Sequence, residues 1–205
     1  MTRWAVLSDV HGNLPALERA IAACRARGAD RFVYLGDLLG RGNSDACVEL
    51  VRETASISVI GNRDLDWAGR VGPAARAYVL SLPRIAEAGD FAVVHGDARL
   101  HPAPSTADLR RGFRRSYGWL RERGKRLGFF GHSHHARVWR KSSEEAPPEA
   151  LQGYVVEVPR VAGAVYFVNV GTTGLPFPGK GPPSCALYDD QARTVEHLIL
   201  ERAPG

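Results

Sequence analysis

Seven side chains in this sequence could hold metal ions, and each follows a short apolar segment. They are Asp9, His11, Asp37, Asn62, His95, His132 and His134. This mixture of carboxylate, imidazole and amide groups suits Mn, Fe, Zn, Ni or Co. Seven ligands exceed what one such ion needs, but they suffice for two ions if one carboxylate is shared. The sequence therefore predicts a site for two divalent metal ions.

The spacing within the motifs supports this prediction. Asp9 and His11 are two residues apart, as are His132 and His134, so in an extended segment both members of a pair point to the same side. Taken alone, His95 would more often be a satisfied polar group than a ligand, and Gly36-Asp37 could be only a turn. It is the presence of all the motifs in one chain that favours a common site.

Each motif is expected to follow a strand. Strands are predicted over residues 4–7, 31–35, 57–60 and 127–130, with a hairpin over 84–94 that turns at Gly89-Asp90. Helices are predicted over 14–27, 44–54 with Ser44 as the N-cap, 73–82 and 105–123. Ligand sites of open α/β sheets form beyond the carboxyl ends of the strands, where the loops converge.

Strand–helix alternation in the first half of the chain implies a parallel core sheet covered by helices. Beyond Gly131 the pattern is all-strand, with strands over 136–141, 153–158, 165–170, 184–188 and 194–200 and an exposed loop over 142–149. We predict an α/β fold with two packed mixed sheets. Neither a repeat nor a linker divides the sequence, so residues 1–205 are expected to form a single domain.

Composition narrows the class of protein. Apolar residues make up 44% and charged residues 24%, as in ordinary globular proteins. A net charge of +5 attracts phosphate-bearing partners of many kinds and does not select nucleic acid. The three cysteines lack metal-knuckle or redox spacing, which indicates small apolar side chains in a reducing compartment. The first apolar run is too short for a signal peptide or a membrane span, so a cytoplasmic protein is expected.

The motifs together resemble the calcineurin-like metallophosphoesterase superfamily, over a stretch from Val6 to about Tyr188. The similarity lies in Asp9-x-His11, Gly36-Asp37 with Gly42, Gly61-Asn62-x-Asp64, His95 and Gly131-His132-Ser133-His134. The segment from Ser8 to Leu17 is similar to bacterial members related to diadenosine tetraphosphatases and serine/threonine protein phosphatases. Asn169 to Gly174 resembles a strand end of the same family.

The resemblance implies a metallo-dependent phosphatase-like fold, a four-layer α/β/β/α sandwich. It assigns Asp9, His11 and His134 to a first metal, Asn62, His95 and His132 to a second, and Asp37 to both. Manganese is the first choice of metal, with Fe, Zn, Ni or Co as alternatives. A hydroxide bridging the two metals would attack phosphorus in line with the leaving alcohol.

Two arginines complete the predicted catalytic set of Asp37, Asn62, Arg63 and Arg41. Arg63 stands where many family members carry a histidine that assists the leaving group, and an arginine is a poor proton donor. It could instead bind the phosphoryl group or the second ester of a diester. The alternative is an ion pair with Asp64 or Asp66. Arg41 matches a phosphate-binding arginine of the protein-phosphatase branch, although Gly40 replaces the aspartate before it; the alternative is a solvated side chain.

A basic stretch lies farther along the chain. It contains Arg110, Arg111, Arg114, Arg115, Arg121, Arg123, Lys125 and Arg126. It could steer phosphate-bearing substrates toward the site, or it could be a solvated helix. For its aromatic residues Phe113, Tyr117 and Trp119 we favour a place in the core over base stacking.

The favoured function is a metal-dependent phosphodiesterase acting on small nucleotide-like substrates. A phosphomonoesterase or a protein serine/threonine phosphatase is the alternative, and a non-enzymatic scaffold is a remote one because all seven ligand positions are filled. The expected partner is a small phosphate ester, with nucleotides among the candidates. We expect neither a membrane association nor a stable nucleic-acid complex, and the oligomeric state is open.

Overall fold

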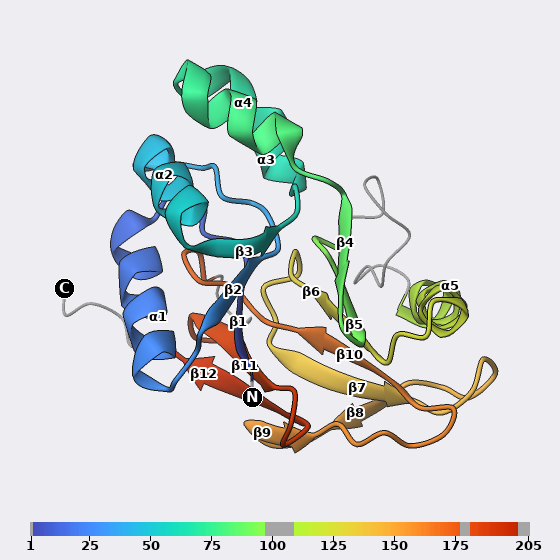
Figure 1. The fold of residues 1–205 in the computed structure, drawn as a ribbon. Helices are drawn as coiled ribbons and strands as arrows, with labels where there is room; N and C mark the ends of the chain where they lie inside the picture. Colours follow the sequence, from blue (N-terminus) through green and yellow to red (C-terminus); the bar gives the residue numbers. More distant parts are fainter. Residues whose placement is uncertain (1, 97–108, 177–180, 201–205) are drawn as a thin grey trace.

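The protein folds as two mixed sheets packed face to face and flanked by helices (Figure 1). The structure is a computed structural model that describes residues 2–96, 109–176 and 181–200. Within these residues the sheets have strand orders β3-β2-β1-β11-β12-β9 and β4-β5-β6-β10-β7-β8. In the first sheet β1, β2 and β3 are parallel, and in the second β5, β6 and β10 are parallel. The predicted mixed sheets are confirmed.

The elements have the following bounds. The first sheet contains β1 (Arg3–Leu7), β2 (Arg31–Tyr34), β3 (Ala55–Ser58), β9 (Val155–Glu157), β11 (Ser184–Asp189) and β12 (Thr194–Ile199). The second contains β4 (Ile85–Ala88), β5 (Phe91–Val94), β6 (Leu127–Phe130), β7 (Arg137–Lys141), β8 (Glu149–Leu151) and β10 (Val165–Asn169). The helices are α1 (Leu14–Ala26), α2 (Ser44–Thr54), α3 (Asn62–Trp67), η1 (Ala68–Arg70), α4 (Pro73–Ser81) and α5 (Leu109–Glu122).

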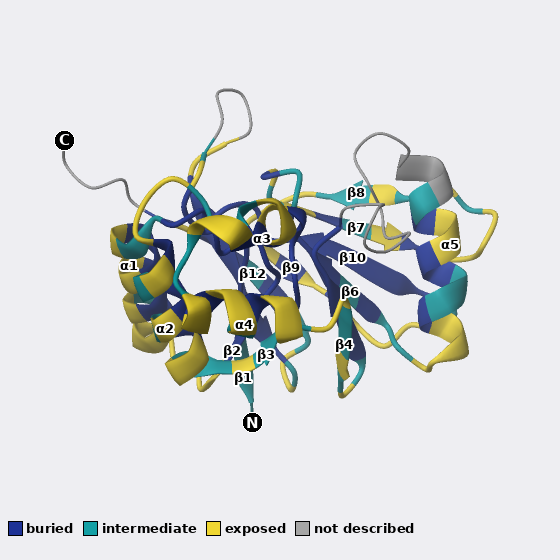
Figure 2. Cartoon of the chain, turned by 90° about the horizontal axis from the view of Figure 1, so that it is seen from above, coloured by how far each residue is buried: buried dark blue, intermediate teal, exposed yellow. Residues whose placement is uncertain are grey.

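Three hydrophobic clusters separate four layers. On β1, Ala5 and Leu7 pack with α1, α2 and α4, whereas Val6 points into the cluster between the sheets. On β10, Val168 enters that central cluster, and Phe167 packs against α5. Alternation with period 2 thus gives each central strand two buried faces. Figure 2 shows the buried sheets between helices whose outer faces are exposed. The predicted four-layer α/β/β/α sandwich is confirmed.

The first two helices begin at asparagine caps. Asn13 accepts a hydrogen bond from the Ala16 amide, as expected for a helix that starts there. For α2 the prediction of Ser44 as N-cap is wrong. Asn43 caps the helix by accepting from the Ala46 amide. Ser44 is the first helical residue, and its Oγ bonds to the backbone of Gly40 instead.

The region after β2 departs most from the prediction. The third strand was expected over 57–60 but is β3, Ala55–Ser58, because that segment is the one in register with β2. The helix α3 directly after it was not predicted, since six residues are too few to show helical spacing. The predicted loop over 142–149 ends one residue early, because Glu149 begins β8 and pairs with Arg140 on β7.

Other expectations agree closely with the structure. The hairpin of β4 and β5 is present, and Cys24, Cys47 and Cys185 are all buried free thiols. The last predicted helix is α5; its expected first residues, 105–108, lie outside the described residues. Among the helices that the structure describes, each is too short or too polar to cross a membrane.

Candidate metal centre

The loops that follow the parallel strands of both sheets meet at one point. The Asp9 amide donates to the carbonyl of Gly36 across the β1 and β2 loops. The Gly131 amide donates to the carbonyl of His95 across the β5 and β6 loops. The carboxyl ends of β1, β2, β5 and β6 therefore bring the predicted ligands together from both sheets (Figure 1).

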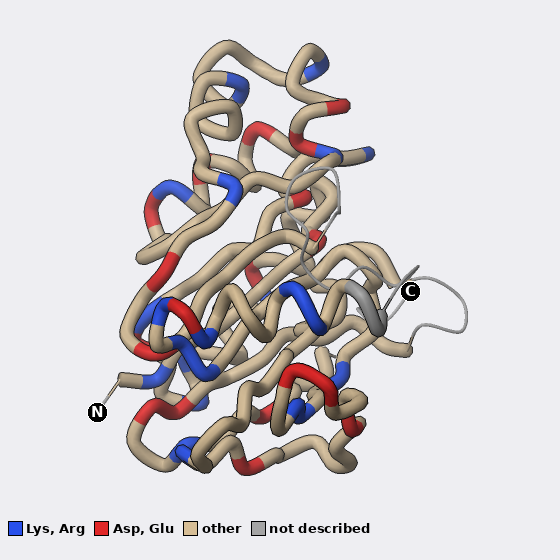
Figure 3. Tube along the Cα trace, turned by 90° about the vertical axis from the view of Figure 1, so that its right-hand side faces the viewer, with Lys and Arg blue, Asp and Glu red and all other residues tan. Residues whose placement is uncertain are grey.

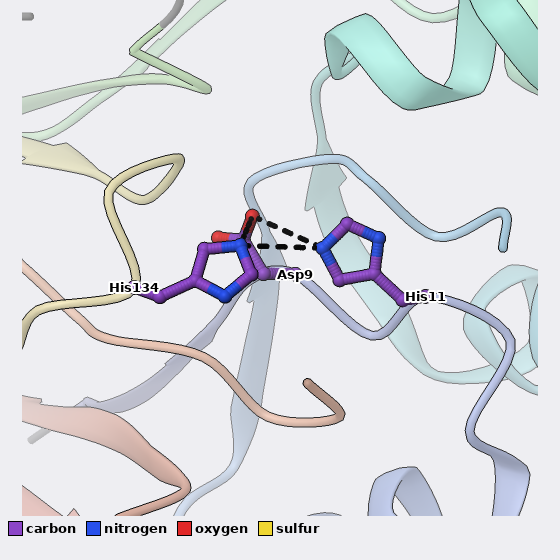
Figure 4. A group of neighbouring side chains, drawn as sticks. All are labelled: Asp9, His11 and His134. Atoms are coloured by element: carbon purple, nitrogen blue, oxygen red, sulfur yellow. Dashed lines mark hydrogen bonds and ion pairs between the residues drawn. The ribbon is translucent and has the colours of Figure 1, made fainter. Parts of the chain in front are cut away.

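The first cluster consists of Asp9, His11 and His134 (Figure 4). His134 Nε2 lies 3.0 Å from Asp9 Oδ1 and 3.3 Å from His11 Nε2. His11 Nε2 is 3.6 Å from the same Asp9 oxygen. All three side chains are buried. Three donor atoms from two loops thus converge at metal-ligand spacing.

The second cluster consists of Asn62, His95 and His132. Asn62 Oδ1 lies 3.0 Å from His95 Nε2 and 3.0 Å from His132 Nδ1, and the two ring nitrogens are 3.2 Å apart. Asn62 is the first residue of α3, so this helix, which the sequence did not predict, positions one of the predicted ligands.

Asp37 lies between the two clusters. Its Oδ2 is 3.4 Å from His95 Nε2 and 3.9 Å from His11 Nε2, so one oxygen faces a histidine of each cluster. Its Oδ1 accepts a hydrogen bond of 2.7 Å from the Arg63 amide, which holds the carboxylate in this orientation. The structure thus brings all seven predicted ligands to one place.

Hydrogen bonds fix the tautomers of two histidines. His95 Nδ1 lies 2.8 Å from the carbonyl of Leu35, and His134 Nδ1 lies 2.7 Å from the carbonyl of Leu175. Because a carbonyl only accepts, each Nδ1 carries the proton in the neutral ring. Each Nε2 then keeps a lone pair directed at the cluster, as a metal ligand requires.

The polar groups of the site fit a cation. Asp9, Asp37 and Asp64 are buried carboxylates, and in the described part of the chain the ion pairs of Asp9 and Asp37 are formed with histidines alone. Asp9 Oδ1 is buried without a hydrogen-bond partner. Burying a carboxylate costs free energy unless an opposite charge lies next to it. Divalent cations bound between these side chains would supply that charge.

The pKa values of the site also indicate a concentration of negative charge that suits a cation. Burial alone would raise the pKa of Asp9, but its contacts with His11, His134 and His95 hold it well below the ordinary value. Burial would lower the pKa of His95, but Asp37 and Asp9 raise it to about 10. Without metal, the negative charge of the site is therefore balanced by protons on histidine.

Backbone strain is concentrated at the ligands. Among the described residues other than glycine, six have a positive φ, and five of these are predicted ligands. They are Asp9 (57°), His11 (52°), Asp37 (54°), His132 (64°) and His134 (59°). Left-handed conformations of such residues cost energy and persist where the surrounding structure enforces them, as at functional sites.

Two positioning residues were not assigned a role from the sequence. Asp64 is fully buried and accepts hydrogen bonds of 2.8–3.0 Å from the amides of Asp37, Leu38, Leu39 and Gly61. Asn169, at the end of β10, donates to the carbonyl of Gly131 and to Ser133 Oγ, within the loop that carries His132 and His134. Both residues belong to the sequence motifs. Their roles were not predicted because most of the groups to which they bond are distant in the sequence.

Close backbone contacts hold the β2 loop in place. A Cβ atom at Gly36, where φ is +87°, would lie 2.3 Å from the Gly61 nitrogen. A Cβ atom at Gly40 would lie 2.4 Å from the carbonyl oxygen of His11. An aspartate, the residue of the protein-phosphatase branch, therefore does not fit at position 40 in this loop conformation.

A cleft of about 790 Å³ opens over the predicted metal ligands. Arg41 and Arg63 both line it and are exposed. The Arg63 guanidinium lies 3.9 Å from Asp66, a weak pair because both side chains are about half exposed. Asp64 is bonded to backbone amides instead, so only one of the two predicted ion-pair partners of Arg63 is near its side chain.

Of the basic stretch, the side chains that the structure describes, from Arg114 to Arg126, do not line this cleft. Arg114 is paired with Glu144 and Glu145. Figure 3 shows Lys and Arg interspersed with Asp and Glu over the described part of the chain. Phe113 and Tyr117 are buried in the cluster between α5 and the second sheet, and Trp119 packs against it. The predicted core location of the aromatic residues is confirmed. Residues 97–108 and the side chains of 109–111 lie outside the described residues.

Comparison with known proteins agrees with this geometry. Residues 2–193 match the sequence model of the calcineurin-like phosphoesterase superfamily domain. The crystal structure of a metallophosphoesterase from Sphaerobacter thermophilus has 30% identity and a TM-score of 0.81, covering 98% of this chain and 90% of the other. The uncharacterized protein MJ0912 of Methanocaldococcus jannaschii is 28% identical over 96% of this chain and 86% of its own length.

A more distant similarity shows the fold alone. A novel archaeal phosphodiesterase has 15% identity and a TM-score of 0.56, covering 97% of this chain and all (100%) of the other.

Fold, site and sequence match together place the chain in one family: it belongs to the calcineurin-like phosphoesterase superfamily. It is a metal-dependent phosphoesterase, a hydrolase of ester bonds. The superfamily uses divalent metals, and the described residues include clusters that could hold them.

Proposed function

We propose that the protein is a dinuclear-metal phosphodiesterase acting on small nucleotide-like esters. The observation that carries this proposal is the position of Asp37, whose Oδ2 faces a histidine of each ligand cluster. Asp9, His11 and His134 would hold one cation, and Asn62, His95 and His132 the other. Two divalent cations, when bound, would lower the pKa of a water between them toward neutrality and neutralise charge on the phosphoryl oxygens.

The side chains around the clusters would bind and orient the substrate. Arg41 and Arg63 are exposed in the cleft, where a guanidinium can pair with two phosphate oxygens. A guanidinium is a poor proton donor to the leaving alcohol, so Arg63 would bind the substrate without acting as a general acid. The enzyme should accordingly favour esters with good leaving groups, because general acid catalysis contributes roughly 10²–10⁴-fold.

Two observations favour a small diester over a phosphoprotein. Arg63, in place of a proton-donating histidine, can contact an ester group that stays on phosphorus. Gly40 touches the His11 carbonyl so closely that the aspartate of the protein-phosphatase branch has no room. A phosphomonoesterase is the second candidate, since the same cations and arginines would also bind a monoester.

A panel of activated monoesters and diesters, assayed with Mn, Ni, Co, Zn and Mg, tests the proposal. For the natural protein we expect a higher kcat/KM on diesters than on monoesters. The variant Asp37→Asn should lose activity and bind only one metal ion per chain. Monoester preference would support the phosphomonoesterase instead. A protein that takes up one metal per chain at saturation would contradict the dinuclear site, and one that is inactive with every metal would favour the scaffold alternative.

The same panel tests Arg63. In Arg63→His we expect rates on unactivated esters to rise by about tenfold or more, because an imidazole can donate a proton to a poor leaving group. Rates that are unchanged on both activated and unactivated esters would contradict this role. Manganese as the preferred metal, a cytoplasmic location, a single domain over 1–205 and the lack of a stable nucleic-acid complex stay predictions.

A further inference from the structure

Besides the predicted ligand Asn62, the helix α3 carries two cleft-lining residues that lie one turn apart. Arg63 and Trp67 both line the cleft, and residues four apart lie on the same face of a helix. Between them, Asp64 points into the protein and Leu65 is exposed outside the cleft. The helix thus presents a cation and an aromatic ring toward the space above the metal ligands.

The indole ring of Trp67 is held in place. It is partly buried and packs against the hydrophobic cluster formed by α1, α2 and α4. The guanidinium of Arg70 lies over the ring, 4.7 Å from its centroid. Because these contacts already restrict the ring, a ligand that touches its free part would cost little additional side-chain entropy.

The size of the cleft indicates a ligand much larger than a phosphoryl group. Its volume of about 790 Å³ lies in the range of pockets that hold whole small molecules. Pro15, Leu39 and Leu175 also line it, so part of its wall is apolar. A substrate that carries only a phosphate and a methyl group would leave this surface without contacts.

Along α3, the predicted metal ligand and the aromatic ring are at opposite ends. Asn62, a predicted metal ligand, is the first residue of the helix, and Trp67 is the last. Five residues correspond to about 7.5 Å along a helix axis. An aromatic group at Trp67 is therefore set apart from the scissile phosphorus, as a base is by the sugar of a nucleotide.

We propose that Trp67 is a specificity-determining residue, which binds the aromatic base of a nucleoside ester while Arg63 contacts the phosphate to which it is attached. This inference rests on the proposed phosphodiesterase function and extends it to the ester that is retained on phosphorus. Base and ring would meet in an offset or edge-to-face arrangement. Removing an aromatic ring that makes such contacts lowers the affinity for the ligand about 5- to 100-fold.

The test compares two diesters with the same leaving group. These are the p-nitrophenyl ester of thymidine 5′-monophosphate and methyl p-nitrophenyl phosphate, assayed with the metal-loaded protein. The natural protein should prefer the nucleoside ester in kcat/KM. In Trp67→Leu, which keeps apolar bulk but has no ring, this preference should fall about tenfold. Because both substrates report on the same folded fraction, partial unfolding of the variant cancels in the ratio.

Two controls accompany this variant. Trp67→Phe keeps an aromatic ring and should retain the preference within about twofold. Leu65→Ala changes an exposed residue of the same helix, 45% exposed and outside the cleft lining, and should also retain it. A preference in Trp67→Leu within twofold of the natural protein would overturn the proposal, as would an equal loss in Leu65→Ala.

A binding measurement separates this inference from the proposed function. Calorimetry gives the Kd of thymidine 5′-monophosphate and of methyl phosphate for the natural protein and for Trp67→Leu. If the protein hydrolyses monoesters but neither diester, the phosphodiesterase proposal fails. A nucleotide-over-methyl preference in Kd that disappears in Trp67→Leu would still support the aromatic subsite, and an unchanged preference would refute it.

Discussion

At the residue scale, the chemistry of this protein is concentrated in side chains whose donor atoms face one another. Residue types and spacing were enough to predict that these seven side chains meet, because the loops after parallel strands converge at one edge of a sheet. That they bind metal stays a prediction. The supporting residues were not predictable in this way. Asp64 acts on amides 25 to 27 residues earlier in the chain, and neither composition nor local spacing reveals such partners.

Replacing Asp64 by asparagine should loosen Asp37, the proposed shared ligand. The carboxylate accepts from four amides, including that of Asp37 itself. An asparagine offers one acceptor oxygen and would turn its NH₂ group toward donors. We expect a loss of about 1–3 kcal/mol in the free energy of unfolding. We also expect weaker uptake of the second metal and a fall in kcat that exceeds any change in KM.

Urea denaturation, metal titration by calorimetry and steady-state kinetics measure these effects. Asp66→Asn is the matched control, because this residue is on the same helix but is about half exposed. It should leave metal uptake unchanged. A variant Asp64→Asn that binds two metals with the natural affinity would show that Asp64 supports the fold without positioning Asp37.

At the element scale, long regular elements could be predicted and short ones at the site could not. The helix α1 has its asparagine cap, its proline in the first turn and Gly28 beyond its end at a φ of +79°, so local sequence specifies it. The strand β3 is shifted from its most apolar segment because pairing with β2 decides the register. The short α3 is held in place because Asp64 accepts hydrogen bonds from amides of the loop after β2. The helix has too few residues for its periodicity to be recognised in the sequence.

Contact between the β1 and β2 loops gives a prediction at this scale. In Gly40→Ala the new Cβ would lie 2.4 Å from the His11 carbonyl, so the two loops must move apart. Overpacking of this kind costs about 1–3 kcal/mol, and because His11 is displaced, metal affinity should fall as well. Urea denaturation and metal titration measure the two effects.

Gly69→Ala provides the matched substitution. A Cβ at this position, in η1, has no atom within 4 Å among the described residues. It should therefore leave the free energy of unfolding within about 0.5 kcal/mol of the natural value. Equal stability and equal metal affinity of the two alanine variants would mean that the loop contact at Gly40 does not constrain the site.

At the scale of the whole molecule, the two sheets form the site jointly. Asp9, His11, Asp37 and Asn62 come from loops of the first sheet, whereas His95, His132 and His134 come from the second. The layer order followed from the sequence, since strand–helix alternation and the later run of strands imply two mixed sheets. Which later strands return to the first sheet did not follow, because that depends on β11 pairing with β1 over nearly the whole chain length.

A buried histidine near the junction of the sheets should couple the stability of the whole fold to pH. His197 on β12 is buried, and its Nε2 donates a 2.8 Å hydrogen bond to the carbonyl of Asn169 on β10. Burial lowers the pKa of His197 below its ordinary value, and the hydrogen bond offsets this only in part. As the pH falls below about 6.5, the unfolded chain therefore binds a proton that the folded protein does not yet bind.

The stability supplied by neutral His197 is consequently complete above about pH 6.5 and is lost as the pH falls toward the lowered pKa of the folded state. Urea denaturation at pH 7.5 and pH 5.5, with a chelator present so that metal binding does not contribute, measures this loss. His197→Gln cannot titrate but can still donate to Asn169. The natural protein should lose about 1 kcal/mol more than this variant between the two pH values. Equal losses would show that His197 does not link folding to pH, and that the acid sensitivity of the fold comes from other groups.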